Sequence, residues 1–133
     1  MRVLLADGHP QLLEAIRGFL EPHLNVVQCV DNGESLFEAA MMLQPDVIVT
    51  DISMPKLSGI EAAKRLRESG CPSKVVFLAA YGDPDVVRAA LKTGALAYVL
   101  KISIDTDLLL AIQEAIEGRV FISSSDADPQ PTN

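Results

Sequence analysis

A chain of 133 residues, 49% of them hydrophobic, is long enough for one domain with a buried core and too short for a second domain of useful size. Its formal net charge of −7 argues against a basic surface that binds nucleic-acid phosphates, so we expect that this domain does not bind nucleic acid itself. No apolar run approaches the roughly 18 residues of a membrane span or has the form of a signal peptide, which predicts a cytoplasmic protein with no membrane partner.

Five short apolar runs alternate with longer amphipathic stretches along the chain. The runs lie at residues 3–6, 26–30, 47–50, 75–78 and 97–100, and we predict a strand at each. Between them apolar residues recur at every third or fourth position, which indicates helices with one buried stripe each. Because the strands are apolar almost throughout, both faces of the sheet must be covered, as in parallel sheets with helices on both faces.

Residues that favour helix ends flank these amphipathic stretches. The predicted starts are marked by Pro10, by Asp31 with Glu34, by Ser58 with Glu61, and by Asp83 with Pro84. Gly70 and Gly94 suit helix ends, since glycine readily adopts the left-handed conformation that ends many helices. Met41 and Met42 fit a core-facing turn of the second helix better than a binding stripe.

Right-handed crossovers between five parallel strands favour a flavodoxin-like α/β fold, a doubly wound five-stranded parallel sheet of order 2-1-3-4-5 with helices on both faces. In that order the first and third strands are neighbours, and the residues that follow them are Asp7 and Asp51. Ligands of such sheets bind at this edge, so we expect these two carboxylates to lie close together. Lys101 follows the fifth strand at the same edge.

One mechanism uses two carboxylates and a lysine at such an edge. Asp51 would act as a nucleophile toward a phosphoryl donor, Asp7 would help to hold Mg²⁺, and Lys101 would pair with the phosphoryl oxygens. The plainer alternative is that Asp51 ends a strand and Lys101 neutralises two buried acids. His9, which stands before Pro10 without partners at ligand spacing, is interpreted as part of a helix start rather than as a metal ligand.

Three segments together resemble the response-regulator receiver domain of two-component signalling, most closely receivers of the NarL/FixJ type. The segments are Leu4-Leu5-Ala6-Asp7-Gly8-His9-Pro10, Asp51 with Met54-Pro55 and Gly59, and Tyr98-Val99-Leu100-Lys101. The resemblance implies that Asp51 is the phosphoacceptor and that Ser53 supplies a metal-binding backbone carbonyl. It also implies an aromatic switch at Tyr98 and the family's signature lysine at Lys101. The alternative for Tyr98 is a half-buried ring whose hydroxyl faces water.

Two residues depart from the pattern of the family that the chain resembles. Gly8 stands where the family has the second of two acids, a direct Mg²⁺ ligand. Ala79 stands where the family has a Ser or Thr whose hydroxyl bonds the phosphoryl group and couples it to the aromatic switch. Loss of the ligand and of the hydrogen bond predicts weakened phosphorylation and a Mg²⁺ site that is weak or absent.

The resemblance implies a histidine kinase or other phosphodonor as partner, no enzyme activity, and an output, usually a DNA-binding domain, outside this chain. The alternative is a phosphorylation-independent pseudo-receiver that forms a homodimer or binds a partner through a helical face. A flavin or nucleotide binder of the same fold is a third possibility, disfavoured because Gly8-His9-Pro10-Gln11 lacks the glycines and hydroxyls of a phosphate loop. We predict a receiver domain over residues 1–122 and a polar linker or disordered tail over residues 123–133.

Overall fold

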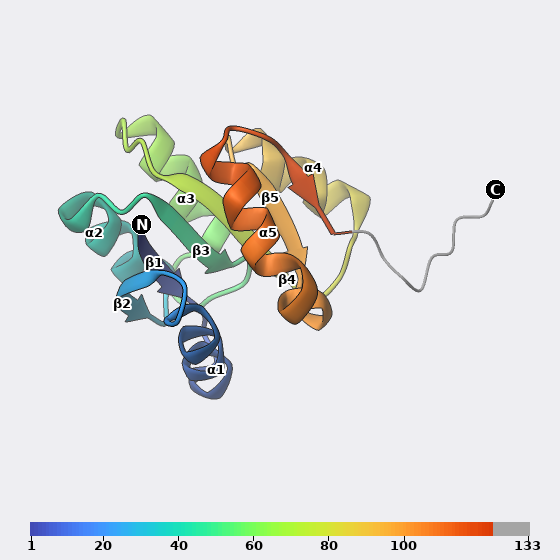
Figure 1. Cartoon of the computed structure of the whole chain (residues 1–133). Coiled ribbons are helices and arrows are strands. Elements are labelled where there is room, and N and C mark those ends of the chain that lie inside the picture. Colours follow the sequence, from blue (N-terminus) through green and yellow to red (C-terminus); the bar gives the residue numbers. More distant parts are fainter. Residues whose placement is uncertain (124–133) are drawn as a thin grey trace.

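Strands and helices alternate along residues 1–123, the part of the chain that a computed structural model describes (Figure 1). The strands are β1 (Arg2–Ala6), β2 (Asn25–Val30), β3 (Val47–Asp51), β4 (Lys74–Ala79), β5 (Ala97–Leu100) and β6 (Phe121–Ile122). The helices are α1 (Pro10–Leu20), α2 (Gly33–Leu43), α3 (Gly59–Glu68), α4 (Pro84–Lys92), the 3₁₀ turn η1 (Lys101–Ser103) and α5 (Ile104–Ile116). Residues 124–133 of the predicted tail lie outside the described residues.

All strands pair in parallel in one sheet of order β2-β1-β3-β4-β5-β6. The predicted order 2-1-3-4-5 is confirmed, and each of the five predicted strands is found within one residue at each end. The sixth strand was not predicted, because two residues are too short for a periodic pattern to mark them. It extends the sheet beside β5 without changing the fold.

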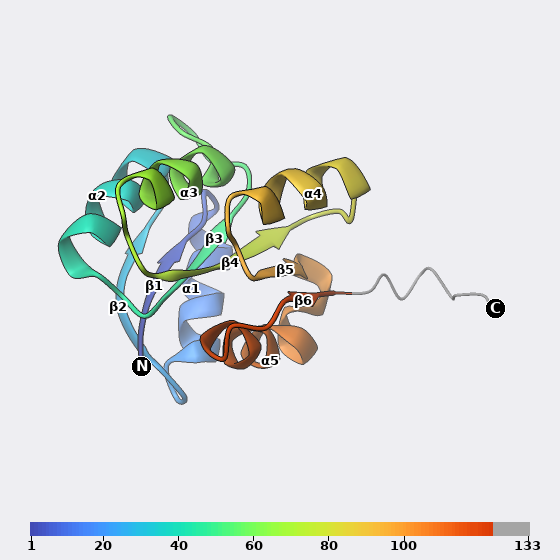
Figure 2. The same cartoon turned by 90° about the horizontal axis from the view of Figure 1, so that it is seen from above.

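The helices cover both faces of the sheet, as predicted. Helices α2, α3 and α4 lie on one face, and α1 and α5 lie on the other (Figure 2). Side chains of successive strand residues enter opposite cores: Leu4 packs with the α2, α3 and α4 side, whereas Leu5 packs with the α1 and α5 side. Burial of the strands on both faces explains why their sequences are apolar almost throughout.

Helix starts agree with the sequence at two capping sites and differ at one. Ser58 accepts a hydrogen bond from the Glu61 amide and Asp83 accepts one from the amide of Asp85, as their spacing predicts. The predicted cap at Asp31 is wrong, because Asn32 caps α2 by accepting a hydrogen bond from the Ser35 amide at 2.9 Å. Both residue types favour caps, and only the place where the helix begins distinguishes them.

The prediction that Met41 and Met42 face the core is also wrong. Met42 is 82% exposed and Met41 is 37% exposed. The buried stripe of α2 runs through Leu36, Ala40 and the half-buried Leu43, so a residue one position before Leu43 lies off the stripe.

Ser123 fixes the end of the described chain to the sheet. Its amide donates to the Tyr98 carbonyl at 2.9 Å, and its hydroxyl donates to Asp107 Oδ2 at 2.7 Å. The same hydroxyl oxygen accepts a hydrogen bond from the Leu100 amide at 3.2 Å. These contacts join β6, β5 and α5 immediately beside Lys101, so the last described residue touches the strand that leads to the candidate site.

Ser123→Ala is expected to lower the free energy of unfolding by about 1–2 kcal/mol, because it leaves a buried amide and a carboxylate oxygen without this partner. Hydrogen exchange should show faster exchange of the Leu100 amide, and urea unfolding should give the loss in stability. Ser69→Ala, at an exposed position, is the control and should have little effect. Unchanged exchange at Leu100 would contradict this role for the Ser123 hydroxyl.

Candidate functional site

Two buried carboxylates meet where the winding of the sheet changes direction. Asp51 is the last residue of β3, and Asp7 directly follows β1. The register pairs Ala6 with Thr50, so the next residue of each strand continues side by side. The exposed fractions are 0% for Asp7 and 5% for Asp51. The expectation that these acids converge at the carboxyl edge of the sheet is confirmed.

Lys101 completes this cluster from the end of β5. Its Nζ lies 3.1 Å from Asp7 Oδ2 and 3.1 Å from Asp51 Oδ2. Two carboxylates and one ammonium leave the cluster with one net negative charge. Because the Lys101 side chain is only 20% exposed, water screens these ion pairs less than it would at the surface. The pocket therefore favours binding of a further cation.

The remaining carboxylate oxygens differ in their hydrogen bonding. Asp51 Oδ1 accepts from the Ser53 amide at 3.3 Å, and Asp7 Oδ1 accepts from the His9 amide at 2.8 Å. Asp7 Oδ2 is buried and has no hydrogen-bond partner among the described residues, although it pairs electrostatically with Lys101. A buried carboxylate oxygen without a hydrogen-bond donor is a position that fits a metal ligand.

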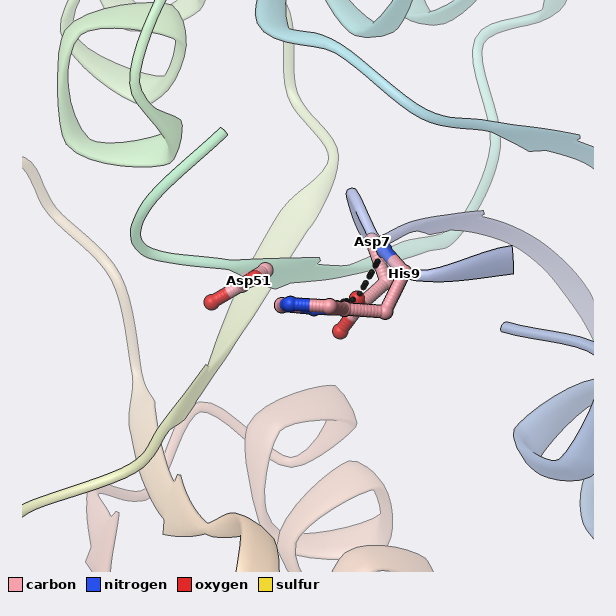
Figure 3. A group of neighbouring side chains, drawn as sticks. All are labelled: Asp7, His9 and Asp51. Atoms are coloured by element: carbon pink, nitrogen blue, oxygen red, sulfur yellow. Dashed lines mark hydrogen bonds and ion pairs between the residues drawn. The ribbon is translucent and has the colours of Figure 1, made fainter. Parts of the chain in front are cut away.

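The imidazole of His9 lies beside Asp7 and extends toward Asp51 (Figure 3). His9 Nδ1 is 3.2 Å from Asp7 Oδ1. His9 precedes α1, as predicted, but its side chain makes no capping hydrogen bond. The sequence did not reveal the direction of this ring, since a single histidine before a proline carries no ligand spacing.

An open depression of about 510 Å³ adjoins these residues. Asp51, Ser53, Ala79, Tyr98 and Lys101 contribute to its lining. The methyl group of Ala79 stands at the end of β4, next to the strand that carries Asp51. No hydroxyl of residue 79 is therefore present to bond a group held in the depression.

Gly8 leaves room for a larger side chain at the other departure from the family pattern. A Cβ atom added there would lie 3.3 Å from Pro55 Cδ and 3.8 Å from the carbonyl oxygen of Asp31. The first distance is tight, and a small shift of the proline ring would relieve it. An acid at this position therefore requires the Pro55 ring to move by a few tenths of an ångström.

Tyr98 is buried, with its ring under the depression. It is 1% exposed, and its hydroxyl donates to the Tyr81 carbonyl at 2.6 Å. The alternative of a half-buried ring with its hydroxyl in water is wrong, because the β4–α4 loop supplies a protein acceptor. Burial raises the pKa of the Tyr98 hydroxyl, and the negative charge of Asp83 raises it further.

Gly59 permits a close backbone approach that positions Asp51. A Cβ atom at residue 59 would lie 2.0 Å from the backbone oxygen of Asp51. The Gly59 amide also donates to the Ile52 carbonyl at 2.7 Å, which folds the β3–α3 loop back onto the strand end. Sequence inspection identified Gly59 only through the family resemblance; the contact that requires glycine became visible in three dimensions.

Gly59→Ala is expected to lower the free energy of unfolding by about 2–3 kcal/mol, because the added methyl group forces the backbone at Asp51 to move. Gly18→Ala is the matched control: Gly18 lies inside α1, and nothing lies within 4 Å of its added Cβ. That change should raise stability by about 0.5–1 kcal/mol, the usual helix preference for alanine. Urea unfolding of both variants measures the two effects; losses of equal size would contradict the contact.

The fold and the site first define a class: a flavodoxin-like α/β domain with an acidic pocket and one lysine at the carboxyl edge of its sheet. The comparison with protein families then identifies the domain. The sequence model of the response regulator receiver domain family matches residues 3–113, and the chain belongs to this family.

Relatives of known sequence are transcriptional regulators of the NarL type. The chain is 37% identical over 124 residues to the uncharacterized transcriptional regulatory protein YvfU of Bacillus subtilis (strain 168), a match that covers 91% of this chain and 62% of YvfU. It is 34% identical over 125 residues to the nitrate/nitrite response regulator protein NarL of Escherichia coli (strain K12), covering 92% of this chain and 58% of NarL. The chain thus spans about three fifths of the length of these relatives.

A solved structure has the same fold. The non-phosphorylated receiver domain of the stress response regulator RcsB from Escherichia coli is 30% identical, with a TM-score of 0.85, and the match covers 93% of this chain and 98% of that domain. None of the helices in residues 1–123 combines the length and the hydrophobicity of a membrane span.

Proposed function

We propose that Asp51 accepts a phosphoryl group and that Gly8 and Ala79 weaken this phosphorylation relative to the family. The main support is the ammonium of Lys101, which lies 3.1 Å from both buried acids beside an open depression. In this role the domain is a signalling module rather than an enzyme, since the phosphoryl group ends on the domain itself.

The proposed chemistry is nucleophilic attack by a carboxylate. An oxygen of Asp51 attacks the phosphorus of the donor, the bond from phosphorus to the donor's leaving atom breaks, and the product is an aspartyl phosphate and the freed donor. Lys101 then neutralises part of the charge of the transferred group. Asp7 and Asp51 would hold Mg²⁺ together with the backbone carbonyl of Ser53 that the family resemblance implies, and this ion would offset the repulsion between carboxylate and phosphoryl oxygens.

The two departures are large enough to affect this chemistry strongly. A charge pair at about 4 Å is worth roughly 4 kcal/mol at an effective dielectric constant near 20, which bounds the effect of the missing acid at Gly8. A hydrogen bond to a charged group is worth about 1.5–3 kcal/mol, which is the missing contribution of a hydroxyl at Ala79. At roughly 1.4 kcal/mol for each factor of ten in rate, the combined loss spans several orders of magnitude.

The proposed partner is a histidine kinase or a small phosphodonor, and the proposed output is gene regulation. YvfU is a transcriptional regulatory protein, and this chain covers 62% of it. We infer that the output is a DNA-binding domain separate from residues 1–123. The net charge of −7 supports a domain that controls such a module without binding nucleic acid itself.

A second candidate function is a phosphorylation-independent pseudo-receiver that binds a partner or a second copy of the chain through a helical face. Two observations favour it. Lys101 already neutralises part of the acidic pair, and Tyr98 is already buried with its hydroxyl bonded to the Tyr81 carbonyl. With a methyl group at Ala79, no side-chain hydroxyl at the end of β4 links the pocket to Tyr98.

Incubation with an acyl phosphate and Mg²⁺, followed by intact mass measurement, separates the two candidates. Slow and incomplete addition of one phosphoryl group, lost in Asp51→Asn, is the expected result. Fast and complete modification would contradict the weakening by Gly8 and Ala79. No modification of Asp51 at all would favour the pseudo-receiver, and sedimentation velocity would then test whether the chain forms a homodimer.

A further inference from the structure

Three side chains at the acidic pocket present metal-ligand atoms toward one another. Asp7, His9 and Asp51 each offer an atom within 4.8 Å of the others (Figure 3). Both acids are buried, and they come from the ends of two adjacent strands that hold their backbones in register. The set is therefore two carboxylates and one imidazole, rather than the all-oxygen set that Mg²⁺ prefers.

His9 can turn toward a bound ion by giving up one contact, that of its Nδ1 with Asp7 Oδ1 at 3.2 Å. Its side chain is 74% exposed and makes no capping hydrogen bond at the start of α1. Zinc sites in proteins are tetrahedral with bonds of about 2.1 Å, so two ligand atoms of such a site stand about 3.4 Å apart. The three ligand atoms lie within 4.8 Å of one another, so rotation of the exposed imidazole together with a small contraction of the set brings them to that spacing.

A second, independent feature points to a cation at the same place. Asp7 Oδ2 is fully buried and has no hydrogen-bond partner among residues 1–123. This oxygen lies 3.1 Å from Lys101 Nζ, and the attraction between these two charges is the interaction that it makes. A buried anionic oxygen in this state is available to a metal ion.

We propose that Asp7, His9 and Asp51 form a divalent-metal site that prefers imidazole-binding metals of the Zn²⁺ class to Mg²⁺. Imidazole suits Zn²⁺, Cu²⁺, Ni²⁺ and iron, and affinities along the first-row series rise toward copper, whereas Mg²⁺ selects hard oxygen ligands. Gly8 removes a carboxylate from the pocket, and His9 supplies a nitrogen ligand in its place. This inference goes beyond the proposed phosphorylation and does not require it.

Lys101 competes with a metal ion for the same oxygens. Its ammonium contacts Asp7 Oδ2 and Asp51 Oδ2, so a bound dication displaces it or shares these atoms with it. Removal of this competitor in Lys101→Met is therefore expected to raise the affinity for Zn²⁺ and for Mg²⁺ together. An increase in both affinities would show that the two metals bind the same carboxylates. A substitution of His9, in contrast, is expected to change the affinity for Zn²⁺ and not that for Mg²⁺.

Calorimetric titration of the full chain with Zn²⁺ and, separately, with Mg²⁺ tests the site. Zn²⁺ is expected to bind at least about 100-fold more tightly than Mg²⁺. His9→Gln should weaken Zn²⁺ binding by about ten-fold or more and leave Mg²⁺ binding within about two-fold, because Mg²⁺ does not depend on the nitrogen. Histidine ring signals in nuclear magnetic resonance spectra should shift for His9 on addition of Zn²⁺.

The chain offers matched controls for a non-specific zinc ligand. His23 is the other of its two histidines and is exposed, so His23→Gln should not alter binding of Zn²⁺. Cys71→Ser should likewise leave it unchanged, which separates the pocket from a thiolate. Equal Zn²⁺ affinity in the native chain and in His9→Gln, or a loss in either control, overturns the proposal. Such a failure leaves Asp51 phosphorylation untouched, since intact mass in Mg²⁺ reports that reaction by itself.

Discussion

Gly8→Asp combined with Ala79→Thr is expected to raise the rate of Asp51 phosphorylation in Mg²⁺ by about 100-fold or more. The new carboxylate supplies the direct Mg²⁺ ligand that the pocket lacks, and the new hydroxyl supplies a hydrogen bond to a charged group worth about 1.5–3 kcal/mol. Both changes introduce the residue types that the resemblance to the family implies at these positions, so we expect their effects on the transferred group to add in the same direction.

Both side chains fit with a small adjustment of Pro55 beside residue 8. A Cβ atom at residue 8 meets only Pro55 Cδ at 3.3 Å and a carbonyl oxygen at 3.8 Å, and Ala79 already lines the depression that borders Asp51. The added acid also changes the charge of the cluster from one net negative to two, because Lys101 remains its single ammonium. The gain should therefore depend on Mg²⁺, and chelation of the metal should remove it.

Intact mass measured over time with an acyl phosphate gives the rate for the native chain, both single variants and the double variant. The double variant carrying Asp51→Asn is the control and should stay unmodified. A double variant no faster than the native chain in Mg²⁺ would show that Gly8 and Ala79 are not what limits the reaction. An equal gain without Mg²⁺ would contradict the role of residue 8 as a metal ligand.

Lys101→Met is expected to lower the free energy of unfolding by about 3 kcal/mol, because it leaves two buried carboxylates with no cation between them. Asp51→Asn has the opposite charge effect: Lys101 then faces the single carboxylate of Asp7, and the cluster becomes neutral. That variant should be as stable as the native chain or more stable. The two changes remove opposite partners of one ion pair. If any disturbance of the site simply destabilised the fold, both variants would be less stable than the native chain, whereas the charge argument predicts a loss only for Lys101→Met.

Urea unfolding at low ionic strength measures both variants. The surface pair Lys64–Glu61, 3.6 Å apart with both side chains about half exposed, provides the control, and Lys64→Met should change stability by less than about 0.5 kcal/mol. Addition of a divalent cation should recover part of the stability of Lys101→Met, because the ion replaces the missing positive charge. A loss in Lys101→Met no larger than that in Lys64→Met would show that the pocket is screened like the surface.

The sequence was sufficient for the parts of the fold that rest on local periodicity. Apolar runs at residues 47–50 and 75–78 could be buried only in a sheet covered on both faces, and the alternation of strands with helices selected a parallel doubly wound order. That order by itself places Asp7 beside Asp51. Lys101 followed from the same rule, since it too stands directly after a strand of this sheet.

Other features of the site were open until the chain was folded. Asp31 and Asn32 have similar capping preferences, and the folded chain uses Asn32 as the cap of α2. The β3–α3 loop packs against the start of this helix so closely that a Cβ atom at Gly33 would lie 1.9 Å from the Leu57 backbone oxygen. The Tyr98 hydroxyl found its acceptor in the loop after β4, far along the chain. The identity of such hydrogen-bond partners depends on backbone positions that are set by the fold and not by the residues next to Tyr98 in the sequence.

By itself, then, the sequence determined the sheet order and the two acids and one lysine at its carboxyl edge, because residue periodicity and strand ends are local properties. Only the tertiary structure decided that the His9 ring lies beside these acids, that Ser123 joins β5 to α5, and that Tyr98 is buried. Apart from the local contact of His9 with Asp7, these depend on contacts between segments distant along the chain, whose geometry is fixed when the helices pack onto the sheet.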